Sequence, residues 1–460
     1  MLPSASELVA RFLRTNGYSE TLSNFIAEAG LPQNIGANPT DAITIESVLR
    51  EKQTFDTSLS FEKLGIDDKD HGWLAHAPSR PTVLKSLPSQ SNILSICVME
   101  LALSLVDQAR PYCAITTADR KLHLLDPRSP TYEAVRSYTA FSESPILDII
   151  AIDKQRILVA SMSGRLAVYD TARDVMLEER KDHSKYVVKI ARYVQDDYVY
   201  IATAGWDAKV FLYQYSTAAE GDGAQLGEPR ATLELPSIPE TLLFVSEGDV
   251  PILVVARRDS TFLHYYSVSS PTSPALVFLG KQNLAPHSNA WVAFTPCDIQ
   301  LCPTDSSLVA VATSTTPHMK LFVVRLLIPS GQASLLDTNR ELTQASQARA
   351  ELLIQDRDEA AIIVNVSTLA PQTQYSTPRL VWRPDGSGIY LSSDDGQVRG
   401  IEAITGKLMA TLDGHDPGSK IRCLWAGTFT TSSDSETDTS SQHEVLISGG
   451  FDQKLIVWHP

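Results

Sequence analysis

Two sets of residues combine an imidazole, a hydroxyl and a carboxylate, the three groups of a nucleophilic triad. The sets are His415, Ser448 and Asp452, and His183, Thr203 and Asp207. In a triad the imidazole takes the proton of the hydroxyl while the carboxylate orients the imidazole. The same groups can also form a buried hydrogen-bonded chain that holds strands together. We expect the structural role, because both sets fall at the same place in a repeated pattern of short strands.

Other patterns that signal catalysis or a cofactor are absent from the sequence. There is no Gly-rich phosphate loop, no HExxH and no GxSxG, and the 10 histidines are dispersed. The cysteines are widely spaced and never form CxxC; they are Cys97, Cys113, Cys297, Cys302 and Cys423. This spacing predicts neither a disulfide framework nor a zinc site. We therefore expect no catalytic residues, metal or cofactor, and the alternative of an enzyme would need a site in a central channel.

The strands that carry the polar sets belong to a repeat. Six segments consist of a tight turn followed by an apolar strand, at residues 116–126, 161–170, 203–213, 256–265, 392–402 and 448–459. Their turn residues are Asp119, Ser163, Asp207, Asp259, Asp395 and Asp452, and a degenerate seventh copy lies at 309–324. The first anchors are 44 residues apart (119 to 163, 163 to 207). Such spacing is typical of the four-stranded blades of a β-propeller.

The last repeat resembles the WD40 family. Gly414-His415, Ser448-Gly449-Gly450, Asp452 and Val457-Trp458 match that family's landmarks. The resemblance implies that His415, Ser448, Asp452 and Trp458 form a buried hydrogen-bonded chain, which the third repeat forms with His183, Thr203, Asp207 and Tyr213. The other blades lack the His or the Trp, so we expect them to depend more on apolar packing. We predict a mainly β fold, a seven-bladed WD40 β-propeller over residues 82–460, closed by a strand within 81–91.

Residues 1 to about 66 show helical periodicity instead. Ser4 and Glu7 have the spacing of a capping box, and Asn16-Gly17 ends the first helix. A second helix is expected at about 19–29 and a third at about 43–53. Two helices this short cannot bury a core alone, so we expect them to self-associate.

The first two helices resemble the LisH motif. The matching residues are Leu8, Phe12-Leu13, Gly17-Tyr18, Thr21, Phe25 and Glu28-Ala29. In that family two copies pair as a four-helix dimer, which implies a homodimer through residues 1–36. The implied interface consists of Leu8, Phe12, Tyr18, Leu22, Phe25 and Ile26. The alternative is a hairpin that docks on the rest of the chain, and residues 37–81 are expected to form a helix and linker.

Three insertions lengthen the predicted blades. They are a Gly-rich acidic segment at 218–230, a helix-capable segment at 330–358 and a Ser-rich acidic segment at 430–442. The third suits an acid-directed kinase, or is simply a solvated loop.

A partner surface is predicted at one end of the propeller. In WD40 proteins the residue before the turn Asp faces the mouth of the top surface; here these residues are Ala118, Met162, Trp206, Arg258, Asp394 and Phe451. Trp and Arg are enriched at binding hot spots. We predict that Trp206, Tyr186, Arg258 and Phe451 bind a partner, with Tyr186 beside Trp206. The alternative is that Trp206 only packs against a neighbouring loop.

Composition narrows the partner class. With 54 acidic and 39 basic residues the net charge is -15, which disfavours nucleic-acid binding. No apolar run is long enough to span a membrane and no leader precedes the helices, so we predict a cytoplasmic or nuclear location. The predicted function is a non-enzymatic dimeric scaffold or adaptor for proteins or peptides. Leu125-Asp126-Pro127-Arg128 partly matches a motif of ubiquitin-ligase substrate receptors, which is the alternative; the fold does not choose the partner.

Overall fold

The structure is a computed structural model, which describes residues 4–37, 44–47, 49, 72–73, 75–139, 143–217, 225–269, 274–286, 294–329, 344–431 and 441–460. The chain divides into two compact units, Met1–Gly72 and Trp73–Pro460. Most of the third expected helix, at about 43–53, and residues 432–440 of the acidic insertion lie outside the described residues.

The first unit contains the two expected helices. They are α1 (Ala5–Thr15) and α2 (Ser19–Glu28). The Ser4 hydroxyl accepts a hydrogen bond from the backbone N–H of Glu7 at 3.2 Å and so caps α1. Gly17 has φ +77, the left-handed conformation expected where the chain leaves this helix.

A short segment after α2 completes a small core within this unit. Leu22 and Ile26 are buried with Ala10, and Ile35 packs against them. The Arg14 guanidinium donates to the carbonyl oxygen of Ile35 at 3.2 Å, which holds the segment near α1. One copy of the hairpin therefore already covers Leu22 and Ile26, two of the six residues predicted for the dimer interface.

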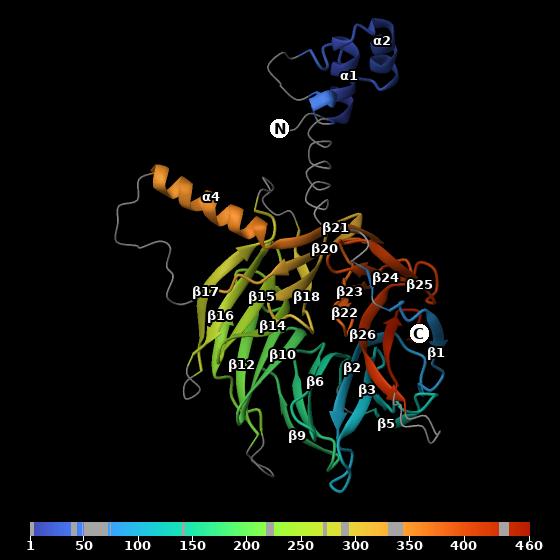
Figure 1. The fold of residues 1–460 in the computed structure, drawn as a ribbon, viewed down its shortest axis with the longest axis vertical. Coiled ribbons are helices and arrows are strands. Elements are labelled where there is room, and N and C mark those ends of the chain that lie inside the picture. Colours follow the sequence, from blue (N-terminus) through green and yellow to red (C-terminus); the bar gives the residue numbers. More distant parts are fainter. Residues whose placement is uncertain are drawn as a thin grey trace. The chain divides into compact units, whose positions relative to one another are not determined.

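The second unit is a seven-bladed β-propeller, as the repeats predicted. Seven four-stranded sheets follow one another along the chain, each an antiparallel meander from inner to outer strand (Figure 1). Blades 1 and 2 contain β2 (Ile93–Leu101), β3 (Arg110–Thr117), β4 (Leu122–Leu125), β5 (Ala134–Tyr138), β6 (Ile146–Ala151), β7 (Arg156–Ser161), β8 (Leu166–Asp170) and β9 (Val175–Arg180). Blades 3 and 4 contain β10 (Val187–Gln195), β11 (Tyr198–Gly205), β12 (Lys209–Ser216), β13 (Ala231–Glu234), β14 (Pro239–Glu247), β15 (Val250–Arg257), β16 (Phe262–Val268) and β17 (Leu276–Asn283).

The remaining blades include the insertions and the ends of the propeller. Blades 5 and 6 contain β18 (Pro296–Leu301), β19 (Leu308–Thr313), β20 (His318–Arg325), β21 (Ile362–Pro371), β22 (Leu380–Trp382), β23 (Gly388–Leu391), β24 (Gln397–Glu402) and β25 (Leu408–Asp413). Blade 7 contains β26 (Ile421–Thr431), β27 (Ser441–Gly450), β28 (Leu455–His459) and β1 (Arg80–Val83). The helix-capable insertion includes α4 (Gln344–Ala360), which precedes β21 (Figure 1).

Strand β1 closes the ring from the start of the propeller. It pairs antiparallel with β28, with Arg80 opposite His459 and Val83 opposite Ile456, and in Figure 1 the blue β1 lies beside the red strands of blade 7. The expected closing segment, 81–91, contains most of β1, while the expected boundary at 82 falls inside this strand. Trp73, in the range expected to be linker, contacts the buried Arg383 of blade 6 at 4.3 Å from ring centroid to guanidinium carbon.

Apolar clusters between neighbouring sheets form the core. One of them joins Tyr112 and Leu122 of blade 1 to Ile149 and Val159 of blade 2. The seven inner strands, β2, β6, β10, β14, β18, β22 and β26, contact one another around a closed ring. Burial of this apolar surface is the main stabilising contribution, at about 25 cal/mol per Å² removed from water.

The two polar sets form buried hydrogen-bonded chains. In blade 7, His415 bonds to Asp452 at 2.9 Å and to Ser448 at 2.8 Å, and the Trp458 indole N–H donates to Ser448 at 2.9 Å. Ser448 is fully buried, so its hydroxyl cannot reach a substrate. This arrangement fits a hydrogen-bonded chain that holds strands together, which we call the strand lock, and not a catalytic triad.

Blade 3 repeats the chain with one difference. His183 bonds to Asp207 at 3.0 Å and to Thr203 at 2.9 Å. Tyr213 is expected in the place of Trp458; its hydroxyl donates to Asp182 at 2.8 Å and also interacts with Thr203. Arg180 also pairs with Asp182, which places a carboxylate within reach of the tyrosine hydroxyl.

Blades 1 and 2 were expected to depend mainly on apolar packing, and that expectation is incomplete. In blade 2 the Ser163 hydroxyl lies 3.1 Å from Ser144 and 3.0 Å from Ser161. In blade 1 the Ser89 hydroxyl donates to Asp119 at 2.9 Å. Hydroxyls from the loop before the inner strand thus replace the histidine and keep the turn hydrogen-bonded.

Glycines allow the turns of blades 2 and 6 to approach the loops that carry His183 in blade 3 and His415 in blade 7. Gly164 has φ +84, and a Cβ there would lie 2.4 Å from the carbonyl oxygen of His183. Gly396 also has φ +84, and its Cβ would lie 2.4 Å from the carbonyl oxygen of Asp416, beside His415. Only glycine fits both the conformation and the space. The turns of blades 2 and 6 therefore pack directly on the chains of blades 3 and 7.

Replacing Asp452 should destabilise the propeller more than replacing Ser163. Asp452 accepts hydrogen bonds from His415 and from the backbone N–H of Asp416 and Lys454, so Asp452→Ala leaves buried donors unpaired. We expect a loss of about 1 to 3 kcal/mol for Asp452→Ala, and less than about 1 kcal/mol for Ser163→Ala, which removes only neutral hydrogen bonds. Urea unfolding of the two variants beside wild type measures both losses, and equal losses would contradict the assigned role of the carboxylate.

Candidate functional site

A ring of bulged residues surrounds one end of the central channel, which we call the mouth. In six of the seven inner strands the register shifts near the strand start, as it does between Val187 and Lys189 in β10. The residues at these bulges are Leu94, Leu147, Val188, Glu240, Cys297 and Arg422. A β-bulge leaves one residue unpaired and re-aims its side chain. The mouth therefore combines apolar residues from blades 1–3 with polar residues from blades 4, 5 and 7.

Three of the four predicted partner-binding residues lie together at this mouth. The rings of Tyr186 and Trp206 are 4.3 Å apart between centroids, and the Arg258 guanidinium carbon lies 4.9 Å from the centroid of Trp206. Glu240 pairs with Arg258 at 2.5 Å. We call Tyr186, Trp206, Glu240 and Arg258 the mouth cluster. Aromatic stacking and the cation–π contact hold these side chains in one arrangement before any partner binds.

Charges from opposite sides of the ring act on this cluster. Burial raises the pKa of Tyr186 to about 12, and the positive charges of Arg258 and Arg422 oppose this rise while Glu240 adds to it. Arg422 belongs to blade 7 and Tyr186 to the start of blade 3. Their electrostatic interaction places the two residues near each other, although they come from different blades.

The other residues predicted for the top surface are separate from this cluster. Phe451 in blade 7 is exposed, and among the described residues it makes no ring contact with the other three predicted binders. Met162 is exposed, whereas Asp394 pairs with Lys420 at 3.1 Å. The structure thus groups Trp206, Tyr186 and Arg258, and it does not bring Phe451 to them.

Sequence reasoning missed charged residues at or next to the starts of three inner strands. Glu240, Arg379 and Arg422 were not predicted, although Glu240 and Arg422 occupy the second position of their inner strands. Alignment of the starts of the inner strands, in addition to the turns, would have selected that position. The pairing of Arg258 with Glu240 has no signal in the sequence, because the residues are 18 apart and meet only across β14 and β15.

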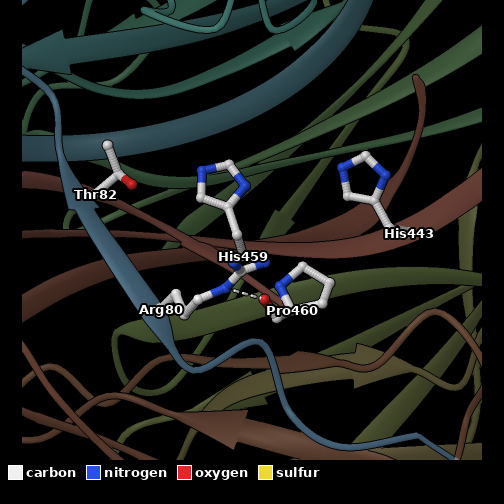
Figure 2. Close-up of a pocket in the computed structure, with 5 residues that line it drawn as sticks. All are labelled: Arg80, Thr82, His443, His459 and Pro460. Atoms are coloured by element: carbon white, nitrogen blue, oxygen red, sulfur yellow. Dashed lines mark hydrogen bonds between the residues drawn. The ribbon is translucent and has the colours of Figure 1, made fainter. Parts of the chain in front are cut away.

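A separate shallow pocket lies on blade 7 beside the closing strand. Arg80, Thr82, His443, His459 and Pro460 line a volume of about 520 Å³ (Figure 2). The Arg80 guanidinium donates to the carbonyl oxygen of Pro460. Burial lowers the pKa of His459, and the nearby His443 and Arg80 lower it further, so the neutral imidazole is favoured. None of these groups aligns a nucleophile with a base, and the pocket suggests no reaction.

The described residues form neither a metal-binding cluster nor a membrane-spanning helix. Within the described parts of the chain, no three His, Cys, Asp or Glu side chains gather closely enough to hold a metal ion. All five cysteines are free, and burial raises the pKa of the Cys97 thiol to about 11, which keeps it protonated at neutral pH. None of the described helices has the length and apolar character needed to cross a membrane.

The remaining residues predicted for the dimer interface keep exposed surface. Tyr18 is 53% exposed and its ring lies 6.4 Å from that of Phe12, which is half-buried, as are Leu8 and Phe25. These four side chains can still contact a second copy.

In the segment that partly matches the motif of ubiquitin-ligase receptors, Arg128 pairs with Asp126 at 3.0 Å.

Comparisons with known proteins identify both units. A family model described as UCP007778, beta-propeller domain, matches residues 85–459, and one described as UCP007778, LisH domain, matches residues 6–33. No curated protein matches the chain significantly. Propeller and LisH domains are interaction modules, which agrees with a mouth cluster that has no catalytic arrangement.

Acid should weaken the polar chain that supports the mouth cluster. Burial lowers the pKa of His183 below the ordinary value of 6.5, although Asp207 opposes this, so the folded protein keeps His183 neutral where the unfolded chain takes up a proton. The stability contributed by neutral His183 is therefore lost as the pH falls below 6.5, by up to about 1 kcal/mol per pH unit. Asp207 adds no pH dependence to stability near pH 6.5. Burial raises its pKa, but the hydrogen bond to His183 outweighs this and keeps the pKa below 3.8.

Urea unfolding between pH 7.5 and 5 measures this dependence. His183→Gln, which cannot titrate, should show a shallower loss of stability than wild type, while the exposed His76→Gln should match wild type. Identical pH dependence in wild type and His183→Gln would contradict the assignment of a neutral His183.

Proposed function

The chain belongs to the UCP007778 family, and on that premise we propose that it is a non-enzymatic dimeric adaptor, which binds a protein or peptide partner at the mouth of its propeller. The observation that carries the proposal is the mouth cluster. Trp206 contacts both Tyr186 and Arg258, and each of the three side chains keeps part of its surface exposed. Rigid aromatic and arginine side chains of this kind dominate the energy of protein interfaces.

The propeller is proposed to be of the WD40 type. The hydrogen-bonded chains of blades 3 and 7 support this, since each joins a loop histidine to a strand hydroxyl and a turn aspartate. In blade 3 this chain also positions the partner surface. His183 lies three residues before Tyr186, and Asp207 directly follows Trp206. The strand lock therefore fixes the two segments that carry these aromatic residues.

Dimerisation through the LisH domain is the second part of the proposal. Leu8, Phe12, Tyr18 and Phe25 are the residues that a second copy would cover, while Leu22 and Ile26 support them from the core. A dimer carries two mouths and gains avidity for a repeated or dimeric partner through effective concentration. Five free thiols suit a reducing compartment, so we place the adaptor in the cytosol or nucleus.

Loss of Trp206 should abolish partner capture. Affinity purification of the full chain, followed by mass spectrometry, identifies proteins that wild type retains in stoichiometric amount. Trp206→Ala should weaken their binding by at least about 2 kcal/mol, close to thirtyfold, with little change in melting temperature, because Trp206 is a half-buried surface anchor.

A matched control removes a different exposed ring. Phe278→Ala on the outer strand β17, where Phe278 is 54% exposed, should leave capture unchanged. If Trp206→Ala unfolds the propeller, Trp206 is a packing residue; if it binds its partners normally, the partner uses another surface. Either result contradicts the proposed site. Capture of a small molecule in place of a protein would favour the alternative of a channel enzyme.

A charge in the LisH interface should produce monomers. Phe12→Asp places an unpaired carboxylate among apolar side chains, which costs several kcal/mol in a buried interface. Light scattering of the full chain at micromolar concentration should show a dimer for wild type and a monomer for Phe12→Asp. Asn24→Asp, exposed on the face of α2 opposite its buried residues, should remain dimeric. A monomeric wild type contradicts the dimer but leaves the mouth site standing.

A further inference from the structure

Arg422 is a charged side chain at the mouth that shares the carboxylate of Asp298 with Arg379. It occupies the bulge at the start of β26, between Ile421 and Cys423. Its Nη1 is inaccessible to solvent and has no hydrogen-bond partner among the described residues. Burial lowers the pKa of Arg422 to about 10, and the neighbouring Arg379 lowers it further. At neutral pH the guanidinium is still charged, and a buried donor left unpaired is energetically costly.

Hydrogen bonds to residues of blade 6 hold the segment that carries Arg379 beside the start of β26, which carries Arg422. The backbone N–H of Ile421 donates to the carbonyl oxygen of Ser393 at 3.0 Å, and the Ser392 hydroxyl accepts from the N–H of Arg379 at 2.8 Å. Arg379 itself has a partner, since it lies 3.7 Å from Asp298. Asp298 is anchored in turn by the N–H of Leu380 at 3.1 Å.

The charges of the mouth therefore sum to one positive charge. Arg258 pairs with Glu240 at 2.5 Å, while Arg379, at 3.7 Å, and Arg422 both lie near the single carboxylate of Asp298. Three arginines therefore face two carboxylates. Tyr186 and Arg422 interact electrostatically, so Arg422 lies near the mouth cluster. A partner held by Trp206 and Tyr186 thus also comes near this guanidinium.

We propose that Arg422 binds one carboxylate of the partner, an Asp or Glu side chain that enters the mouth while the partner backbone lies on the mouth cluster. This inference rests on the proposed function. An arginine binds a carboxylate by charge-assisted hydrogen bonds, which are the strong class and can be bidentate. Arg422 is half-buried, so the accessible part of its side chain can meet the carboxylate, and the pairing would neutralise the remaining positive charge of the mouth.

The local charges favour a carboxylate over a phosphate. A phosphate brings close to two negative charges at neutral pH, and Glu240 and Asp298 would repel the excess. The rest of the protein is acidic, with a net charge of -15, so a segment rich in acids would be repelled before reaching the mouth. The expected partner segment thus has a single acidic residue in a neutral or basic surrounding.

The test uses the purified full chain as bait for a displayed library of random peptides. Wild type should select peptides with one enriched Asp or Glu position, and Arg422→Gln should select peptides without that preference. A selected acidic peptide should bind Arg422→Gln at least about tenfold more weakly than wild type, because removing one member of a desolvated charge pair leaves the other unpaired.

A double-mutant cycle isolates the pair. The Glu→Gln version of the same peptide should lose about as much affinity for wild type, and little further affinity for Arg422→Gln. Arg422→Lys keeps the charge and should retain part of the binding. Melting temperatures of the variants should match or exceed that of wild type, since burial and the repulsion of Arg379 outweigh the attraction of Asp298. A lower melting temperature for Arg422→Gln would assign Arg422 a structural role and overturn the inference.

The possible failures are distinguishable. If an acid preference is absent, or persists in Arg422→Gln, this inference fails while the adaptor proposal stands. If a phosphoserine in place of the Glu binds wild type as tightly or more tightly, the assignment of a single carboxylate is wrong. If wild type selects no peptide, or the selected peptides bind Trp206→Ala as well as wild type, the proposed function fails and this inference fails with it.

Discussion

Pairing of β1 with β28 is the interaction on which the propeller depends. Residues from opposite ends of the domain form the last blade, with Arg80 opposite His459. Without β1, the edge of β28 would expose unpaired backbone groups, and the ring would be joined only through side-chain packing. Closure also sets β26 against β2, which completes the circle of inner strands. The convergence of Arg422 from blade 7 with Tyr186 from blade 3 follows from that circle.

Within the closed ring, the same polar contacts stabilise a blade and present its binding residues. Apolar clusters between sheets supply most of the burial but have little directional preference. The hydrogen bonds of His183 with Thr203 and Asp207 are directional, and they fix a loop and a turn against each other. Tyr186 follows that loop histidine and Trp206 precedes that aspartate, so their stacking is a consequence of the lock. The hydroxyl chains of blades 1 and 2 hold their turns without placing aromatic residues there.

The electrostatics of the protein differ between its whole surface and its mouth. The chain carries a net charge of -15, yet at the mouth three arginines, Arg258, Arg379 and Arg422, face two carboxylates, Glu240 and Asp298. The net charge acts on a partner at long range, whereas the local charge of the mouth acts only on groups in close contact with it. Arg258, which the sequence predicts as a partner-binding residue, is paired within the protein with Glu240.

The sequence by itself determined the features that depend on local spacing. The blades follow from turns that recur every 44 residues at first, the helices from apolar periodicity with Ser4 and Gly17 at their ends, and the strand lock from residue types at matching positions. Tertiary structure alone decided which side chains remain available. Ile35 covers Leu22 and Ile26 because a segment folds back beside α1, and Glu240 neutralises Arg258 because adjacent strands bring them together. Arg422 shares one carboxylate with Arg379 because bulges and ring closure aim distant residues at one space, and no local pattern in a sequence encodes that distance.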